Sequence, residues 1–273
     1  MKLAVSSLAW DPERDADVRQ LLARRGVRGV ELAPLKYWPN VTAVSSSTVA
    51  EYRAQWADAG ISVVALQGIL FGMPDLQLFG SPQQQAGFEA HLVAVARLAG
   101  ALGAPVVVFG APVNRRRGEL SEADAVERAA PLLRRVASAM HDHGTSLCIE
   151  PNPPRYGGDF VRTIAEALEL ARAVDHRGFG VHLDAGALTI DAASDAEILS
   201  AARVARHFHV SEVDLVPVGS GTVDHVRMGQ LLHRARYDSW VSIEMRPVDD
   251  ASLITAIEVA SRAYLSTGME SPE

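Results

Sequence analysis

The sequence predicts a single-domain α/β protein, a closed (β/α)8 TIM barrel, on three observations. The chain has 273 residues, the usual length of one such barrel. Short apolar segments alternate with amphipathic segments from end to end, as in repeated βα units. Glycines also follow four of the amphipathic segments, at the place where a helix ends in a left-handed cap. They are Gly26, Gly60, Gly103 and Gly144.

The first half of the chain supplies four βα units. Apolar segments typical of strands are expected at 3–8, 27–32, 61–67 and 105–109. Amphipathic segments typical of helices follow at 15–25, 47–59, 83–102 and 121–143. The helix that begins at Ser121 carries Glu122 and Asp124 in its first turn, where acidic side chains favour the helix dipole.

The second half supplies four more units. Strands are expected at 146–150, 179–184, 204–209 and 240–244, and helices at 160–174, 195–202, 226–235 and 251–264. The structural alternative is an open doubly wound sheet, but no glycine-rich phosphate-binding motif follows the first strand. We expect residues 1–265 to form the barrel and 266–273 to be a frayed tail.

Composition excludes several classes of protein. The net charge is −7, which gives no basic footprint for nucleic acid or an anionic membrane. The one cysteine, Cys148, excludes an intramolecular disulfide and a cysteine metal cluster, and its strand position indicates a buried thiol. No apolar stretch reaches the ~20 residues of a membrane span, and the start has no signal-peptide layout. We therefore expect a cytoplasmic protein.

A metal-binding residue type stands at the end of each of the last four predicted strands. They are Glu150, Asp184, His209 and Glu244, spaced 34, 25 and 35 residues apart. The carboxyl ends of neighbouring barrel strands meet at one rim, so these side chains are expected to converge. Three carboxylates and an imidazole suit Mg²⁺, Mn²⁺ or Co²⁺, and Zn²⁺ also tolerates such a set. The alternative is a hydrogen-bonded polar rim without an ion, which the mutual repulsion of three carboxylates disfavours.

These strand ends resemble the sugar phosphate isomerase/epimerase superfamily, the xylose isomerase-like TIM barrels, over nearly the whole chain. The resemblance is strongest at residues 149–153, 182–186, 207–212 and 241–246. It implies that Glu150, Asp184, His209 and Glu244 bind one divalent ion, usually Mn²⁺, Mg²⁺ or Co²⁺. It also implies that Glu150 and Glu244 act as the acid/base pair on the two faces of an enediolate, and it suggests a homodimer or homotetramer.

The chain also departs from branches of that superfamily. Ala187 and Leu215 stand where the ketose 3-epimerases carry a histidine and an arginine that contact the ends of the sugar. An ordinary free ketohexose is therefore a doubtful substrate. The third and fourth strands end at Gln67 and near Gly110, without the extra histidines that the endonuclease IV group needs for its zinc site. A role in DNA repair is accordingly disfavoured.

Eight further residues near the predicted rim are candidates for substrate contact. They are Lys36, Gln67, Asn152, Tyr156, His182, Glu212, His225 and Arg246. His182 precedes Asp184 by two residues, so it lines the barrel interior or is simply packed there. Lys36 could meet a carboxylate or phosphate of the substrate, or be solvated. Asn152 and Tyr156 lie in a loop that could close over the site. The run 115–117 of three arginines is either an anion-binding or a solvated loop.

The leading hypothesis is a metal-dependent isomerase or epimerase of a sugar, or of a sugar-like polyol or keto acid. The enzyme would remove a proton next to a carbonyl and pass through an enediolate. Two alternatives stay open at this point. One is a dehydratase on the same scaffold, similar to dehydroshikimate or inosose dehydratases, and the other is a non-catalytic sugar-binding barrel.

Overall fold

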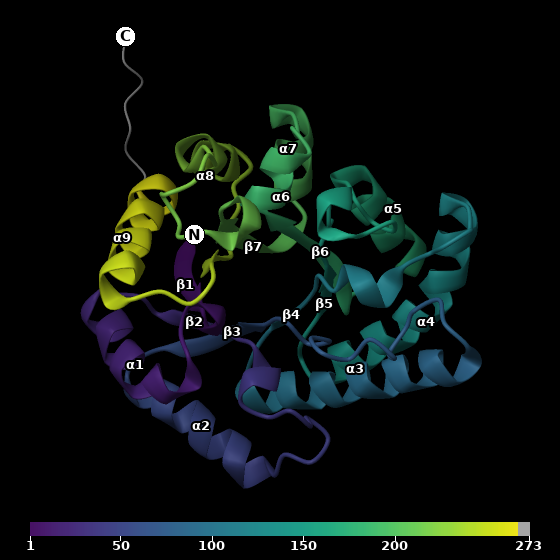
Figure 1. Ribbon diagram of the computed structural model, residues 1–273, viewed down its shortest axis with the longest axis horizontal. Coiled ribbons are helices and arrows are strands. Elements are labelled where there is room, and N and C mark those ends of the chain that lie inside the picture. The colour runs from purple at the N-terminus through teal and green to yellow at the C-terminus, as the bar shows by residue number, and fades with distance from the viewer. Residues whose placement is uncertain (267–273) are drawn as a thin grey trace.

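Eight parallel strands close into a barrel in chain order, and β8 pairs with β1 (Figure 1). The computed structural model describes residues 1–266, so the predicted tail from residue 267 onward lies outside the described residues. The strands are β1 Lys2–Ser6, β2 Gly29–Leu32, β3 Ser62–Leu66, β4 Val106–Phe109, β5 Leu147–Ile149, β6 Phe179–Asp184, β7 Ala205–Ser211 and β8 Trp240–Glu244. The predicted (β/α)8 barrel is confirmed, and the open doubly wound sheet is wrong.

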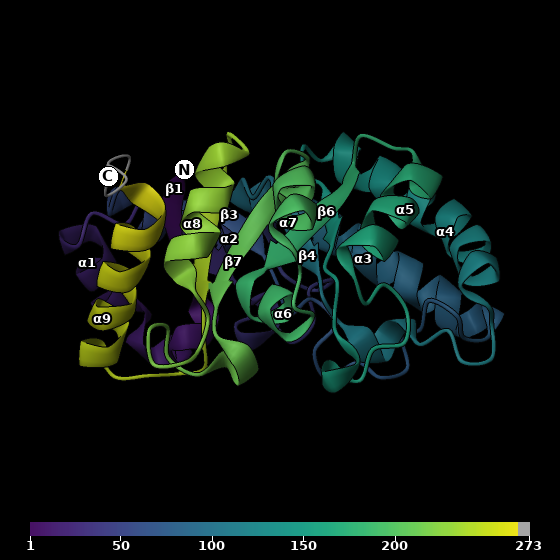
Figure 2. The ribbon, with the colours of Figure 1, turned by 90° about the horizontal axis from the view of Figure 1, so that it is seen from above.

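Helices surround the barrel. They are α1 Asp15–Arg24, α2 Ser46–Asp58, α3 Pro82–Leu102, α4 Glu122–Asp142, α5 Ile164–Val174, α6 Ala185–Ile190, α7 Asp195–Ala202, α8 His225–Arg234 and α9 Asp250–Ala260. In two perpendicular views, α3, α4 and α5 cover one side of the barrel, and α8, α9 and α1 cover the opposite side (Figure 2). No helix of residues 1–266 combines the length and apolar character that a membrane span needs.

The helix ends follow local capping chemistry. All four predicted cap glycines have positive φ, between 71° and 79°. The helix expected from residue 160 begins instead at Ile164, because the Thr163 hydroxyl accepts a hydrogen bond from the Glu166 N–H and caps the first turn. The short helix α6 was not predicted. It begins directly after β6 because Asp184 itself accepts from the Ala187 N–H.

Apolar side chains fill the layer between the strands and the helices, whereas the interior of the barrel is partly polar. Fully buried aromatic side chains such as Trp10, Trp56 and Phe208 lie in the outer layer. The interior holds a small apolar cluster of Ala65, Val106, Val108 and Cys148. The rest of the interior includes buried polar groups, namely Glu31, His182, His207 and Ser242. Branched apolar residues usually fill this space in such barrels, so the polar interior marks the end at which a site is built.

Candidate metal centre

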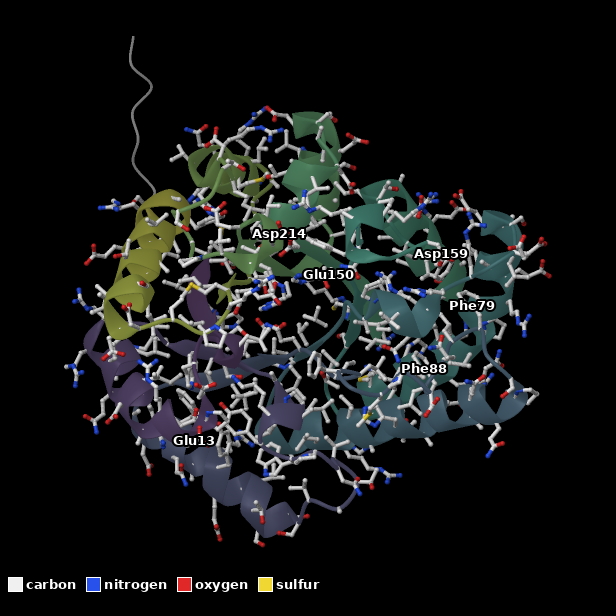
Figure 3. The ribbon with its side chains drawn as sticks, viewed as in Figure 1. Glu13, Phe79, Phe88, Glu150, Asp159 and Asp214 are labelled. Carbon is white, nitrogen blue, oxygen red and sulfur yellow. The ribbon has the colours of Figure 1, made fainter. Side chains whose placement is uncertain are left out.

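The four predicted metal ligands meet around one nitrogen atom at the carboxyl end of the barrel. His209 Nδ1 lies 3.1 Å from Glu244 Oε2, 3.9 Å from Asp184 Oδ2 and 4.0 Å from Glu150 Oε1. Asp184 and Glu244 are the last residues of β6 and β8, His209 lies near the end of β7, and Glu150 directly follows β5. Glu150 lies near the middle of the barrel when viewed from this side (Figure 3). The sequence spacing thus places four donors where their strands converge.

A divalent cation fits this donor set. His209 Nδ1 is buried among three carboxylates, and although Glu244 Oε2 lies 3.1 Å away, the angles at Nδ1 do not satisfy a hydrogen bond. Burial opposes a charged imidazole, yet Glu244 and Glu31 raise the pKa of His209 well above its usual value. A proton on this imidazole is therefore the charge that balances the carboxylates, and a divalent cation would take the place of that proton.

Burial and neighbouring carboxylates also raise the pKa of two of the acidic side chains. Burial, with the neighbouring Asp184 and Glu244 carboxylates, raises the pKa of Glu150 to about 8. Burial and Glu244 raise the pKa of Asp184 to about 6, although His209 and hydrogen bonds from Ser211 and Ala187 oppose the rise. The positive charge of His209 therefore does not offset the burial and mutual repulsion of these carboxylates, and a divalent cation among them would lower the pKa of both Glu150 and Asp184.

Asp184 is held rigidly by its neighbours. The Ser211 hydroxyl donates to Asp184 Oδ2 at 2.5 Å, and the Ala187 N–H donates to Oδ1 at 2.7 Å. The Gly186 N–H donates in turn to the Ser211 hydroxyl at 3.0 Å. The carboxylate therefore keeps one orientation while its remaining lone pairs face His209 Nδ1.

Glu31 is a site residue that the sequence analysis missed. Its carboxylate is fully buried and accepts from His209 Nε2, with its two oxygens at 3.0 and 3.1 Å. Burial alone would raise the pKa of Glu31, but His209 and His207 bring it well below the usual value. Metal-binding histidines commonly donate their second N–H to a carboxylate, which fixes the ring so that the other nitrogen faces the metal. The signal in the sequence is a carboxylate at an inward position of an otherwise apolar strand.

His182 and His207 lie fully buried beneath the ligands. Neither ring has a hydrogen-bond partner within the described part of the chain. His182 Nε2 is 3.9 Å from Glu150 Oε1, and burial together with the neighbouring His209 and His207 lowers the pKa of His182 far below its usual value. His182 is therefore a neutral ring under Glu150. It lines the barrel interior, as one of its two sequence interpretations expected, and not the cavity above.

A cavity of about 680 Å³ lies over the ligands. Four of the predicted substrate contacts line it together with Glu150, Asp184 and Glu244; they are Gln67, Asn152, Tyr156 and Arg246. Leu215, one of the two departures noted from the sequence, also lines the cavity.

Three predicted contacts have internal partners and do not line this cavity. The Lys36 ammonium group donates to the carbonyl groups of Ser7, at 2.8 Å, and Trp10. Glu212 accepts from the Val223 N–H at 3.0 Å and from His225 Nε2 at 3.1 Å. The second nitrogen of His225 lies 2.9 Å from the Tyr264 hydroxyl. The Glu212 and His225 contacts hold the segment between β7 and α8, and the Lys36 contacts join the loops after β1 and β2. None of the three residues lines the cavity.

The interpretation of the arginine run as an anion-binding or solvated loop is wrong for Arg115. Its side chain is fully buried, and the guanidinium donates to the carbonyl groups of Glu150 at 2.6 Å and Phe160 at 2.8 Å, and to Asn152 Oδ1 at 2.7 Å. Burial lowers the pKa of Arg115 to about 10. Arg115 thus ties the end of β5, from which Glu150 projects, to the two loops beside it.

Gly110, directly after β4, leaves the space that the Glu150 carboxylate occupies. A Cβ atom at position 110 would lie 2.1 Å from Glu150 Oε2. The absence of a side chain at the end of the fourth strand is therefore part of how the fifth-strand ligand reaches the centre.

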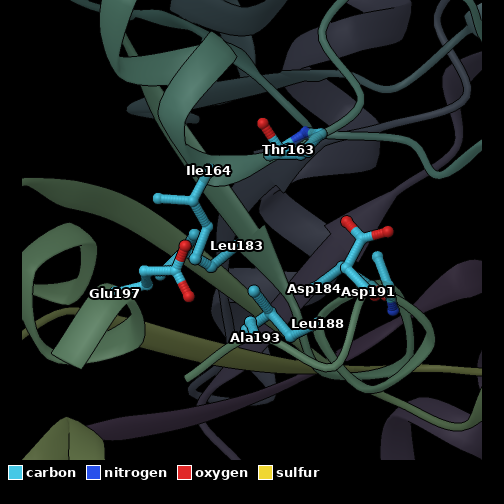
Figure 4. Close-up of a pocket in the computed structure, with 10 residues that line it drawn as sticks. Thr163, Ile164, Leu183, Asp184, Leu188, Asp191, Ala193 and Glu197 are labelled. Carbon is cyan, nitrogen blue, oxygen red and sulfur yellow. The ribbon is translucent and has the colours of Figure 1, made fainter. Parts of the chain in front are cut away.

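A much smaller cavity of about 70 Å³ lies on the outer side of Asp184, among β6, α5, α6 and α7 (Figure 4). Its labelled lining includes Thr163, Leu183, Leu188 and Glu197. The volume is enough for very few water molecules, so of the two cavities beside Asp184 the large one has room for a sugar.

Comparisons with known proteins agree with this geometry. The family described as xylose isomerase-like TIM barrel matches residues 19–262. A comparison with curated proteins found no match. Among solved structures, a D-psicose 3-epimerase from Clostridium cellulolyticum H10 shares 21% identity, with 95% of this chain and 90% of that chain covered and a TM-score of 0.76.

Two further solved structures are similar over almost their whole length. A 3-keto-D-glucoside 4-epimerase from E. coli shares 16% identity, with 96% of this chain and 98% of that chain covered and a TM-score of 0.78. An L-ribulose 3-epimerase shares 20% identity, with 96% and 92% covered and a TM-score of 0.77. Likeness at these identities shows a shared fold.

Proposed function

This chain belongs to the xylose isomerase-like TIM barrel family, and from this premise we propose that it is a divalent-metal-dependent sugar isomerase or epimerase. The observation that carries the proposal is the convergence of the carboxylates of Glu150, Asp184 and Glu244 within 3.1–4.0 Å of the buried His209 Nδ1, beneath a cavity of about 680 Å³. The three solved structures named above are those of sugar epimerases, which supports the same chemistry.

In the proposed reaction, Glu150, Asp184, His209 and Glu244 hold one divalent ion, Mn²⁺, Mg²⁺ or Co²⁺, with Zn²⁺ as a further candidate. When bound, the ion polarises the carbonyl of the substrate and stabilises the negative charge that develops on its oxygen. Glu31 would not bind the ion itself. Its carboxylate accepts the Nε2 proton of His209 in a hydrogen bond, which would leave Nδ1 to face the ion.

Glu150 and Glu244 are the proposed acid/base pair. They project from opposite ends of the row β5 to β8, with the ligands of β6 and β7 between them. One carboxylate removes the proton from the carbon next to the carbonyl, and the other returns a proton to the enediolate. Return to the opposite face gives an epimer, whereas return to the neighbouring carbon gives an aldose–ketose isomer.

Gln67, Asn152, Tyr156 and Arg246 are the proposed substrate contacts, because they line the cavity that holds the acid/base pair. Asn152 Oδ1 is already held by Arg115, so its amide N–H groups are the part that faces a ligand. We also expect a homodimer or homotetramer in the cytoplasm, which light scattering and cell fractionation would check.

Solvent isotope exchange tests the proposal. The Mn²⁺-loaded protein is incubated in D₂O with a panel of ketoses, aldoses and keto-glycosides, and the products are analysed by NMR and mass spectrometry. The expected result is deuterium next to the carbonyl with an unchanged elemental composition. Loss of water from the substrate would instead show a dehydratase.

Two substitutions and a matched control sharpen this test. Glu150→Gln and Glu244→Gln should each lower exchange by at least about a hundredfold. Glu51→Gln, on the exposed face of α2, should leave it unchanged. A protein that takes up no divalent ion by elemental analysis after Mn²⁺ addition would refute the metal centre. Full exchange activity in both glutamine variants would refute the catalytic roles.

A further inference from the structure

The cavity over the ligands has two chemically different walls. The acidic wall holds Glu150, Asp184 and Glu244 at the ends of β5, β6 and β8. A second group of lining residues is apolar and comes from the loops after β3 and β4, with Leu215 from beyond β7. We call it the apolar wall and define it by Ile69, Leu70, Phe71, Met73, Val113 and Leu215.

The cavity is larger than a single sugar ring needs. Its volume of about 680 Å³ falls within the ~300–1,000 Å³ of sites that enclose drug-sized molecules. A sugar whose hydroxyl groups lie at the acidic wall would not cover the apolar wall. The size of the cavity therefore favours a ligand that has a second, apolar part.

Two large side chains of the apolar wall are exposed to solvent, and the exposure of Phe71 is unusual. Phe71 is 85% exposed, the highest value among the large apolar side chains of residues 1–266, and Val113 is 45% exposed. They lie on neighbouring loops at the rim of one cavity. An aromatic side chain that stays in water loses the roughly 2 kcal/mol of stabilisation that its burial would give. Contiguous apolar exposure at a site rim is typical of a surface that a ligand covers.

The apolar wall is preformed. The buried Asn114 carboxamide donates to the carbonyl groups of Met73 and Leu76, both at 2.8 Å. The Leu78 N–H donates back to the Asn114 carbonyl at 2.8 Å, and Gln77 Nε2 donates to the Val113 carbonyl at 3.1 Å. These bonds join the β3 loop to the β4 loop, so the wall meets a ligand without prior ordering.

The charges around the cavity argue against a phosphorylated ligand. Four carboxylates line it, from Glu150, Asp184, Asp214 and Glu244. Arg155 pairs with Asp214, which leaves three carboxylates, and Arg246 is the one lining cation among residues 1–266. A divalent ion would balance about two of those negative charges. A phosphate group would add up to two more, and nothing along the apolar wall would neutralise them.

We propose that the substrate is an unphosphorylated carbonyl sugar that carries an apolar aryl or alkyl substituent. The carbonyl end lies at the acidic wall, and the substituent lies against Phe71, Val113 and their neighbours. This inference rests on the proposed function, because it takes the metal centre as the place where the sugar is held.

Chelators that share one head group test the inference separately from catalysis. Acetohydroxamic acid, 3-phenylpropanohydroxamic acid and phosphoglycolohydroxamic acid are titrated calorimetrically into the Mn²⁺-loaded protein. The phenyl compound should bind at least about tenfold more tightly than acetohydroxamic acid, the gain expected from burial of roughly 60 Å² of apolar surface. The phosphorylated compound should bind no more tightly than acetohydroxamic acid.

Matched double variants locate the gain. Phe71→Ser with Val113→Ser should reduce the advantage of the phenyl tail to below about threefold. Val204→Ser with Val226→Ser, which changes two exposed apolar side chains outside the cavity lining, should preserve it. All four positions are exposed, so neither variant disturbs the core.

The outcomes separate the two proposals. Equal affinities for the phenyl and methyl compounds, or an advantage that survives the Phe71 and Val113 changes, would overturn the apolar substituent and leave the metal centre intact. A phosphorylated compound that binds tenfold more tightly than acetohydroxamic acid would overturn the unphosphorylated substrate. If the protein takes up no Mn²⁺, the metal centre fails and this inference fails with it.

Discussion

Replacement of Gly110 by alanine should disable the proposed metal centre and leave the fold intact. The added Cβ would lie 2.1 Å from Glu150 Oε2, about 1.3 Å short of the 3.4 Å at which ordinary contact begins. Gly110 is not one of the glycines with positive φ, so alanine fits its backbone conformation. The Glu150 carboxylate, at the end of a flexible side chain, is therefore the group that must move.

The size of this movement sets the expected effect. Metal–oxygen bonds to hard divalent ions are about 2.0–2.6 Å long, so a retreat of more than 1 Å breaks one of them. We expect the Mn²⁺ affinity of Gly110→Ala to fall more than tenfold. Turnover should fall by about a hundredfold, because displacement of a reacting group by about 1 Å costs that much.

Competition with a fluorescent chelator measures the affinity, and circular dichroism with thermal denaturation measures the fold. Gly87→Ala in α3 is the control, because its Cβ would meet one Leu76 methyl group at 3.1 Å and lie far along the chain from the ligands. In a double-mutant cycle, Gly110→Ala should add little to Glu150→Asp, whose shorter side chain withdraws the carboxylate from the clash. Unchanged Mn²⁺ affinity in a folded Gly110→Ala protein would refute the steric reasoning.

Three further predictions concern buried groups. Glu31→Gln should lower Mn²⁺ affinity by about ten- to a hundredfold, measured by chelator competition, because the amide no longer offers a charge to the Nε2 proton of His209; an unchanged affinity would show that Glu31 does not position the ligand. Arg115→Met should destabilise the protein by about 2–4 kcal/mol in urea titrations, since several carbonyl groups lose their buried donor; a shift below 0.5 kcal/mol would contradict the role assigned to Arg115. Burial raises the pKa of Cys148 to about 12, so its thiol stays protonated at pH 8, and a disulfide reagent should modify it only after guanidinium unfolding; rapid modification of the native protein would show that the barrel interior opens.

The barrel and the meeting of its four ligands could be predicted because both depend on periodicity. A polar residue that ends a strand is visible in the sequence, and parallel strands carry their ends to one rim. The predicted ligands Glu150, Asp184, His209 and Glu244 lie together for this reason. The helix α6 was not predicted because it begins where the side chain of Asp184 caps it. The sequence analysis had interpreted that side chain only as a metal ligand.

Side-chain partners could not be predicted in the same way. Lys36, Glu212 and His225 stand at positions in the chain where a substrate contact is plausible, but each finds partners inside the protein. Arg115 stands in a run that resembles a solvated loop, yet carbonyl groups from the two loops after β4 and β5 surround it. Such outcomes depend on which backbone carbonyl groups a loop leaves free, and hydrophobic patterning carries no record of them.

The two walls of the cavity come from different halves of the chain, and this division bears on how the protein could change. All four ligands lie between residues 150 and 244, whereas most of the apolar wall lies between residues 69 and 113. Exchange of the β3 and β4 loops could therefore replace the proposed substrate-selecting surface, while Glu31 and the four predicted ligands are inherited unaltered. A library confined to the β3 and β4 loops would explore new specificities without risking the reaction itself, provided that Gly110 and Arg115 are retained.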